Sequence, residues 1–153
     1  GLEVVITRLF NTVGPRQTGA YGMVIPRFVS QALKNEPITV FGDGTQTRTF
    51  TYVKEVVTAL MKLMESDQSI GEVINVGGVE EISILDLARR IIDMTGSSST
   101  VQLIPYAEAF GKDFEDMQRR VPSTEKLEQV TGFAPDKSLD FILEQVINYV
   151  KGL

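Results

Sequence analysis

The chain contains no cysteine and no histidine among its 153 residues. Without cysteine it cannot form a disulfide bond, a thiolate nucleophile or a zinc–thiolate site. Without histidine it lacks the side chain that most often acts as a general base near neutral pH and most often binds metal ions. These two absences exclude the Ser-His-Asp and Cys-His classes of hydrolase.

Long apolar runs and an excess of positive charge are also missing. No segment approaches the ~20 consecutive apolar residues that a membrane-spanning helix needs, so we expect no membrane association. The formal net charge of −5 argues against nucleic acid as a partner, because nucleic-acid binding needs a basic face. The first residues lack the basic and apolar regions of a secretory signal, so we expect a cytoplasmic protein.

The sequence that remains is typical of one globular domain, which we predict to cover residues 1–153. Short β-branched segments alternate with segments whose apolar residues recur at helical spacing. Strands are predicted at residues 4–10, 38–41, 48–53, 72–76 and 101–104, the first of them buried. Helices are predicted from Ile25, through Val56 and Leu63, from Ser83 to Gly96, from Ser123 to Gly132 and from Ser138. This alternation predicts an α/β fold with parallel strands wherever a helix connects them.

Residues 40–53 combine a glycine turn, an aromatic side chain and an arginine. Gly42 and Gly44 flank Asp43, so the backbone there can turn sharply and approach a ligand closely. Arg48 follows in an extended segment, where a guanidinium can hold a phosphate through two parallel hydrogen bonds. Phe41 offers a flat surface for a nucleobase. On spacing alone, however, a plain β-hairpin is the preferred interpretation of this segment.

Two further segments carry polar side chains that suit a ligand. Asn11 ends a predicted buried strand, and α/β sheets bind ligands at the carboxyl ends of their strands. Taken alone, Asn11 is more simply interpreted as a loop cap. Arg119 and Arg120 precede the helix predicted at Ser123 and can add positive charge to the same pocket, although such a pair is usually a solvated face.

In their order and spacing, these segments are far more specific than any one of them alone. The chain contains, in sequence, R-x-F-N-x-x-G-P-R-Q, V-I-P-x-F, V-F-G-D-G-x-Q-T-R-x-F-x-Y-V, G-E-V-x-N-V-G-G, S-I-x-x-L-A and R-R-x-P-S. This pattern resembles the C-terminal part of the extended short-chain dehydrogenase/reductases. More narrowly, it resembles their sugar-nucleotide epimerases, dehydratases and decarboxylases, over residues 2–149.

The resemblance implies an enzyme whose N-terminal Rossmann domain binds NAD, which transiently accepts a hydride from the sugar. A Tyr-x-x-x-Lys pair supplies the catalytic base in that family. The present sequence has no G-x-x-G-x-x-G fingerprint, and none of its tyrosines is followed four residues later by lysine. We therefore expect the substrate-binding portion of a longer enzyme, with the NAD-binding Rossmann domain and the catalytic residues absent from this chain.

The resemblance also implies where the substrate binds. Asn11 falls where the family contacts the diphosphate of the substrate, and Arg48 matches the arginine that clamps the phosphates. Val40 and Phe41 fall where the family holds the nucleobase. The implied partner is a UDP-sugar or a dTDP-sugar.

Two less regular positions complete the implied site. Arg119 falls near a second phosphate or the ribose, and Asp116 falls near the ribose. The implied function is substrate binding in a UDP-glucose 4-epimerase-like enzyme, with a dTDP-glucose 4,6-dehydratase or a UDP-glucuronate decarboxylase as alternatives. A non-catalytic scaffold that kept the fold is an alternative of another class. We also expect a homodimer or self-association of the fragment, because the strand at residues 4–10 would lack its neighbours.

Overall fold

The computed structural model describes residues 1–19, 23–111 and 116–152. The chain forms two compact units. Unit 1 consists of Gly1–Gly14, Thr49–Glu81 and Val121–Ile142, and unit 2 consists of Pro15–Arg48, Ile82–Arg120 and Leu143–Leu153. The prediction that residues 1–153 form a single domain would require both units to fold together, and it stays a prediction.

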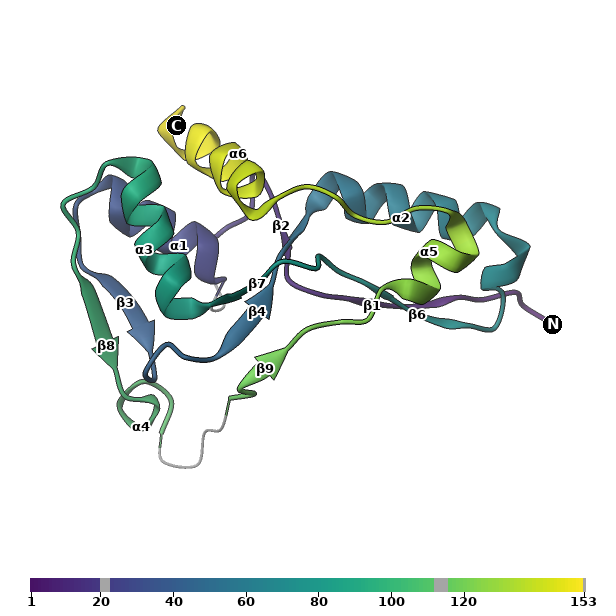
Figure 1. Ribbon diagram of the computed structural model, residues 1–153, viewed down its shortest axis with the longest axis horizontal. Coiled ribbons are helices and arrows are strands. Elements are labelled where there is room, and N and C mark those ends of the chain that lie inside the picture. The colour runs from purple at the N-terminus through teal and green to yellow at the C-terminus, as the bar shows by residue number, and fades with distance from the viewer. Residues whose placement is uncertain (20–22, 112–115, 153) are drawn as a thin grey trace. The chain divides into compact units, whose positions relative to one another are not determined.

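Unit 1 combines short parallel strand pairs with two α-helices (Figure 1). Its elements are β1 (Ile6–Leu9), β2 (Thr12–Val13), β5 (Thr51–Tyr52), α2 (Val53–Glu65), the 3-10 helix η1 (Asp67–Ser69), β6 (Val73–Val76) and α5 (Glu125–Thr131). β1 pairs with β6 and β2 pairs with β5, both in parallel. The parallel pairing predicted from the helical connections is therefore confirmed here.

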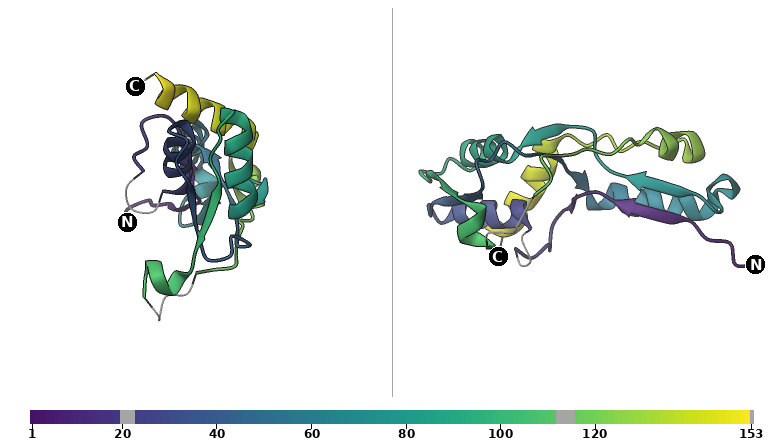
Figure 2. Two further views of the ribbon diagram at one scale, coloured as in Figure 1. Left: turned by 90° about the vertical axis from the view of Figure 1, so that its left-hand side faces the viewer. Right: turned by 90° about the horizontal axis from the view of Figure 1, so that it is seen from below.

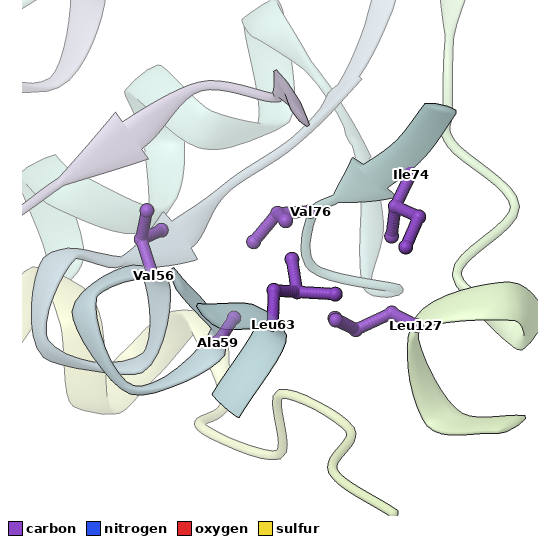
Figure 3. Packing of buried hydrophobic residues seen from close by; sticks show 6 residues of the cluster. All are labelled: Val56, Ala59, Leu63, Ile74, Val76 and Leu127. Atoms are coloured by element: carbon purple, nitrogen blue, oxygen red, sulfur yellow. The ribbon is translucent and has the colours of Figure 1, made fainter. Parts of the chain in front are cut away.

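The core of unit 1 lies between α2, β6 and α5. Figure 3 shows its buried side chains, which are Val56, Ala59, Leu63, Ile74, Val76 and Leu127. The three residues from α2 recur at spacings of three and four, so they form one apolar face of the helix. Burial of this face against β6 and α5 stabilises a helix that propensity alone would leave marginal.

Strand β1 differs from the buried strand predicted at residues 4–10. Ile6 is 57% exposed and Leu9 is 44% exposed. The reason is that the described sheet has only two strands, so β1 has β6 on one side and no strand on the other. Parallel strands are normally covered on both faces, which is why the apolar sequence predicted burial. The self-association expected from such an exposed strand stays a prediction.

Unit 2 packs two helices against short parallel strands (Figure 1 and Figure 2). It contains all or most of α1 (Val24–Leu33), β3 (Ile38–Phe41), β4 (Thr47–Thr49), β7 (Glu81–Ser83), α3 (Ile84–Thr95), β8 (Val101–Ile104), α4 (Tyr106–Ala109) and β9 (Arg119–Arg120). Helix α6 (Leu139–Lys151) begins in the residue range of unit 1 and ends in that of unit 2. None of the helices in the described residues is long and apolar enough to span a bilayer.

The ends of α3 follow the predicted capping signals. Ser83 precedes the helix, and its hydroxyl accepts a hydrogen bond from the backbone N–H of Asp86 at 3.0 Å. Gly96 ends the helix in the left-handed conformation, with φ of 62°, which glycine adopts without steric cost. Both predicted ends are confirmed. The helix predicted from Ser123 to Gly132 is also found, since α5 starts two residues later, at Glu125, and Gly132 follows its last turn.

The β-hairpin that spacing alone favoured for residues 40–53 does not form. β3 pairs in parallel with β8, in the register Val40 to Leu103, whereas β4 lies between β7 and β9. The two strands on either side of the glycine turn therefore belong to different sheets. As a result, the turn brings β4 beside β9 rather than beside β3, and this arrangement positions the candidate site.

The buried face of α2 gives a direct test of the unit 1 core. Leu63 is 1% exposed, whereas its neighbour Met64 is 84% exposed. We expect Leu63→Ala to lower the free energy of unfolding by about 2–5 kcal/mol, because it leaves a cavity in the core. Met64→Ala is the matched control and should change it by less than about 0.5 kcal/mol. Equal effects in chemical denaturation would contradict the packing described for α2.

Candidate functional site

The glycine turn after β3 is held in place by close contacts within unit 2. Gly42 and Gly44 have φ of 72° and 77°, a region that residues with a side chain rarely adopt. A Cβ atom on Gly42 would lie 2.5 Å from Cε2 of Tyr106, and one on Gly44 would lie 2.9 Å from Cβ of Leu85. Glycine is therefore required at both positions by the backbone and by its neighbours.

Asp43 stabilises the same turn from its exposed side. Its Oδ1 accepts hydrogen bonds from the backbone N–H of Thr45 at 2.9 Å and from the Thr45 hydroxyl at 2.7 Å. These bonds, the backbone one first, hold the pKa of Asp43 below its usual value. The carboxylate thus stabilises the turn by accepting a hydrogen bond from the N–H two residues later, as in an Asx turn.

Gln46 connects the turn to the aromatic residues around it. The residue is 5% exposed, and its Nε2 donates to the backbone carbonyl of Phe41 at 3.0 Å and to the Tyr106 hydroxyl at 2.8 Å. Its two amide hydrogens are thereby both used. Gln46 was not selected from the sequence, since a glutamine in a turn carries no signal until its distant partner is known.

Tyr106 extends this connection to Asp116. The Tyr106 hydroxyl donates to Oδ2 of Asp116 at 2.9 Å while it accepts from Gln46. Burial raises the pKa of Tyr106 to about 12, and the hydrogen bond to the Asp116 carboxylate acts in the same direction. The phenol is therefore neutral over the physiological range and donates continuously to Asp116.

Arg48 lies at the other end of the Asp116 carboxylate. Its Nη2 is 2.7 Å from Oδ1 of Asp116, and its Nη1 donates to the backbone carbonyls of Thr47 at 2.8 Å and Met117 at 2.7 Å. The side chain is only 11% exposed. Since a guanidinium carries five N–H donors, these bonds leave one on Nε and one on Nη2 without an acceptor among the described residues. Two such neighbouring donors suit one phosphate or carboxylate.

Val40 and Phe41, which are predicted to hold the nucleobase, differ in the groups that a ligand can contact. The Val40 side chain is fully buried, so only its backbone can meet a ligand. Phe41 is half-buried, with the Arg27 guanidinium carbon 4.5 Å from its ring centroid and the Phe110 ring centroid at 4.9 Å. The backbone N–H groups of Ile38 and Gly42 point towards β8 and donate to the carbonyl oxygens of Thr100 and Ile104. By strand alternation the N–H of Phe41 is directed away from β8.

The register of β9 adds an arginine that the sequence analysis did not select as a substrate ligand. β9 pairs in parallel with β4, so that Arg119 is in register with Thr47 and Arg120 is in register with Arg48. Residues in register on neighbouring strands share a face, and successive residues alternate. Arg120 therefore lies on the Arg48 face and Arg119 on the opposite one. The resemblance named Arg119 rather than Arg120 as a substrate contact.

Asn11 lies in unit 1 and is held by its own backbone surroundings. Its φ is 31°, and its Nδ2 donates to the carbonyl of Thr49 at 2.7 Å. Its carbonyl accepts from the N–H of Thr51 at 3.1 Å. Both bonds join Asn11 to the backbone of a neighbouring segment, as expected if its role is to cap a loop. The implied role at the diphosphate stays a prediction.

The one glycine pair that follows a strand in unit 1 does not have the properties of a dinucleotide site. A Cβ atom on Gly77 would lie 2.4 Å from Cγ of Pro122, and one on Gly78 would lie 2.2 Å from the carbonyl oxygen of Phe50. Both glycines therefore make room for the chain itself. The described residues do not fit NAD at this position.

The raised pKa of Tyr106 predicts a pH dependence of stability. A phenol has an ordinary pKa of 10.0, and that of folded Tyr106 is about 12. Its contribution is therefore fully present below pH 10.0 and is lost as the pH rises towards about 12. We expect Tyr106→Phe to remove this part of the loss, whereas Tyr149→Phe, outside the network, should keep it. Denaturant unfolding across this pH window measures the difference. Parallel losses in all three proteins would contradict it.

Known proteins with a similar sequence or fold support the resemblance. A model of the NAD dependent epimerase/dehydratase family matches residues 1–77. The UDP-N-acetyl-alpha-D-glucosaminuronate decarboxylase of Bacillus cytotoxicus is 39% identical over 152 residues, which are 99% of this chain and 47% of that protein. The UDP-glucuronic acid decarboxylase 1 of Danio rerio is 38% identical over 149 residues, which are 97% of this chain and 34% of that protein.

A solved structure agrees with these relatives. The UDP-glucuronic acid 4-epimerase from Bacillus cereus, in complex with UDP-glucuronic acid and NAD, matches with a TM-score of 0.86 and 33% identity. The match covers 99% of this chain and 46% of that one, so the chain spans less than half the length of these relatives. The predicted resemblance is confirmed. Since the family model matches 77 of the 153 residues, the chain belongs to the NAD dependent epimerase/dehydratase family.

Proposed function

We propose that this chain is the substrate-binding part of an NAD-dependent enzyme that converts a UDP-sugar, and that unit 2 holds the nucleotide diphosphate. The observation that carries the proposal is the fixed guanidinium of Arg48. Three hydrogen bonds and an 11% exposed side chain hold it in one position, and two of its donors have no acceptor among the residues that the structure describes. A donor fixed before binding loses little conformational entropy when the ligand arrives.

The charges around Arg48 suit a diphosphate. Asp116 offsets part of the charge of Arg48 at 2.7 Å. Arg120, in register with Arg48 on the same face of the sheet, adds a second cation. Arg48 and Arg120 thus place two cations on one face of the sheet, within a chain whose net charge is −5. Such a local site attracts a phosphate without making the whole surface basic.

The nucleoside is proposed to lie near Phe41. Gln46 joins the Phe41 carbonyl to Tyr106, which contacts the Asp116 partner of Arg48, so the aromatic and cationic parts of the site are linked. The backbone N–H of Phe41 is directed away from β8, where it can meet the edge of a base. Within the same proposal, Val40 contributes through its backbone and Asp116 meets the ribose.

The remaining implied ligands stay part of this proposal. Arg119 would meet a second phosphate or the ribose, and the implied role of Asn11 is to donate to a phosphate through the amide hydrogen that its bond to Thr49 leaves over. No residue of this chain is proposed to be catalytic. NAD and the catalytic tyrosine are proposed to belong to a part of the whole enzyme that this chain does not contain.

The names of the relatives support a UDP-uronic acid as the sugar substrate of the whole enzyme. The similar protein from Bacillus cytotoxicus and that from Danio rerio are both named as decarboxylases of such sugars, and the similar Bacillus cereus structure is named as an epimerase of one. We therefore propose decarboxylation as the reaction of the whole enzyme, because the relatives named as decarboxylases have the higher identities. Epimerisation at C4 is the second candidate. Mass spectrometry of the product distinguishes them, since decarboxylation releases carbon dioxide and epimerisation leaves the mass unchanged.

Replacement of Arg48 tests the proposed phosphate site. Each charge-assisted hydrogen bond that is lost costs about 1.5–3 kcal/mol, so Arg48→Ala should weaken UDP binding at least about tenfold. Arg48→Lys keeps the charge but not the planar donors and should recover only part of the affinity. Isothermal titration calorimetry of UDP against the 153-residue chain measures the dissociation constant.

The matched control for this experiment is Arg89→Ala. Arg89 is an exposed arginine, 62% accessible, whose ion pair joins it to Asp86 one turn away on α3. We expect its replacement to leave the dissociation constant for UDP unchanged. An unchanged dissociation constant for Arg48→Ala, in protein that unfolds at the wild-type temperature, would refute the proposal.

A further inference from the structure

Arg27 projects from α1 onto the ring of Phe41. Its guanidinium carbon is 4.5 Å from the Phe41 ring centroid and 5.2 Å from that of Phe28. Its Nη1 donates to the hydroxyl of Thr39 at 2.6 Å, which ties the guanidinium to the strand that carries Phe41. The planar cation is thus positioned on the aromatic residue at which the proposed function places the nucleobase.

The charge of Arg27 is not neutralised by a carboxylate in the described part of the chain. Arg48 and Arg89, by contrast, form ion pairs with Asp116 and Asp86. The Nε of Arg27 is buried without a hydrogen-bond acceptor, and burial lowers the pKa of Arg27 from its ordinary value. A half-buried cation without a carboxylate partner is costly unless another molecule supplies an acceptor to its terminal nitrogens. The chain has 20 acidic residues, so this lack of a partner is not a shortage of carboxylates.

The chemistry of the guanidinium restricts what it can recognise. Arginine donates hydrogen bonds and accepts none. A base packed against Phe41 would therefore meet donors, which complement the ring carbonyls of uracil and thymine. Cytosine presents an amino group in place of one of these carbonyls, and adenine presents an amino group as well. Two donors facing each other leave both without an acceptor, which disfavours such bases.

We propose that Arg27 selects a pyrimidine-dione base, uracil or thymine, by donating to the O4 carbonyl oxygen of the base that packs at Phe41, the position at which cytosine carries its amino group. This inference rests on the proposed function and adds a residue that determines base specificity. A purely structural role for Arg27, in which it only stacks on Phe41 and holds Thr39, is the competing account. That role would change the stability of the chain without changing its preference between bases.

Binding of two nucleotides that differ at one ring position separates the two accounts. The dissociation constants of UDP and CDP are measured by isothermal titration calorimetry with the wild-type chain, with Arg27→Met and with the control Arg89→Met. We expect the wild type and the control to prefer UDP at least about tenfold, the cost of an unmatched donor. Methionine keeps the apolar contact with Phe41 but has no donor, so Arg27→Met should lower this preference towards one.

Each result decides one claim. A folded Arg27→Met variant that keeps the wild-type preference overturns the inference and leaves the proposed function intact. Equal binding of UDP and CDP by the wild type also overturns it, whether or not the variant folds. Absence of UDP binding by the wild type overturns the proposed function itself.

Discussion

The ion pair between Arg48 and Asp116 is the interaction on which the geometry of the candidate site depends. It joins β4 to the segment before β9 at 2.7 Å, in surroundings where the arginine is only 11% exposed. Tyr106 and Gln46 extend the connection to the carbonyl of Phe41. Because each member of this network uses donors or acceptors that the next member supplies, the position of the guanidinium is set by residues far away in sequence. Networks of this kind are rigid when every member is satisfied.

If the proposed function holds, this arrangement lets an acidic chain bind a phosphate. The Asp116 carboxylate accepts from Arg48 through one oxygen and from Tyr106 through the other, so it orients the guanidinium while it offsets part of its charge. In the proposed function, a phosphate that binds Arg48 shares it with this carboxylate, and Arg120 lies in register with Arg48 on the neighbouring strand.

Local signals in the sequence predicted the elements but not their partners. Ser83 and Gly96 define the ends of α3 because capping depends on a few adjacent residues. The pairing of β3 with β8 depends on contacts across about sixty residues, and the glycine turn alone favoured a hairpin instead. In the site, Arg48 was identified by its place in a motif. Gln46 was not identified, and Arg120 was named only as one of two charges near the pocket, because tertiary hydrogen bonds and strand register cannot be read from local sequence.

A crystal structure of the 153-residue chain with UDP tests the central claim most directly. The account predicts that a phosphate oxygen accepts from Arg48 within hydrogen-bond distance, with the uracil ring beside Phe41 and the Arg48–Asp116 pair still formed. UDP bound with its phosphates away from Arg48, in crystals where this guanidinium faces open solvent, would contradict the account.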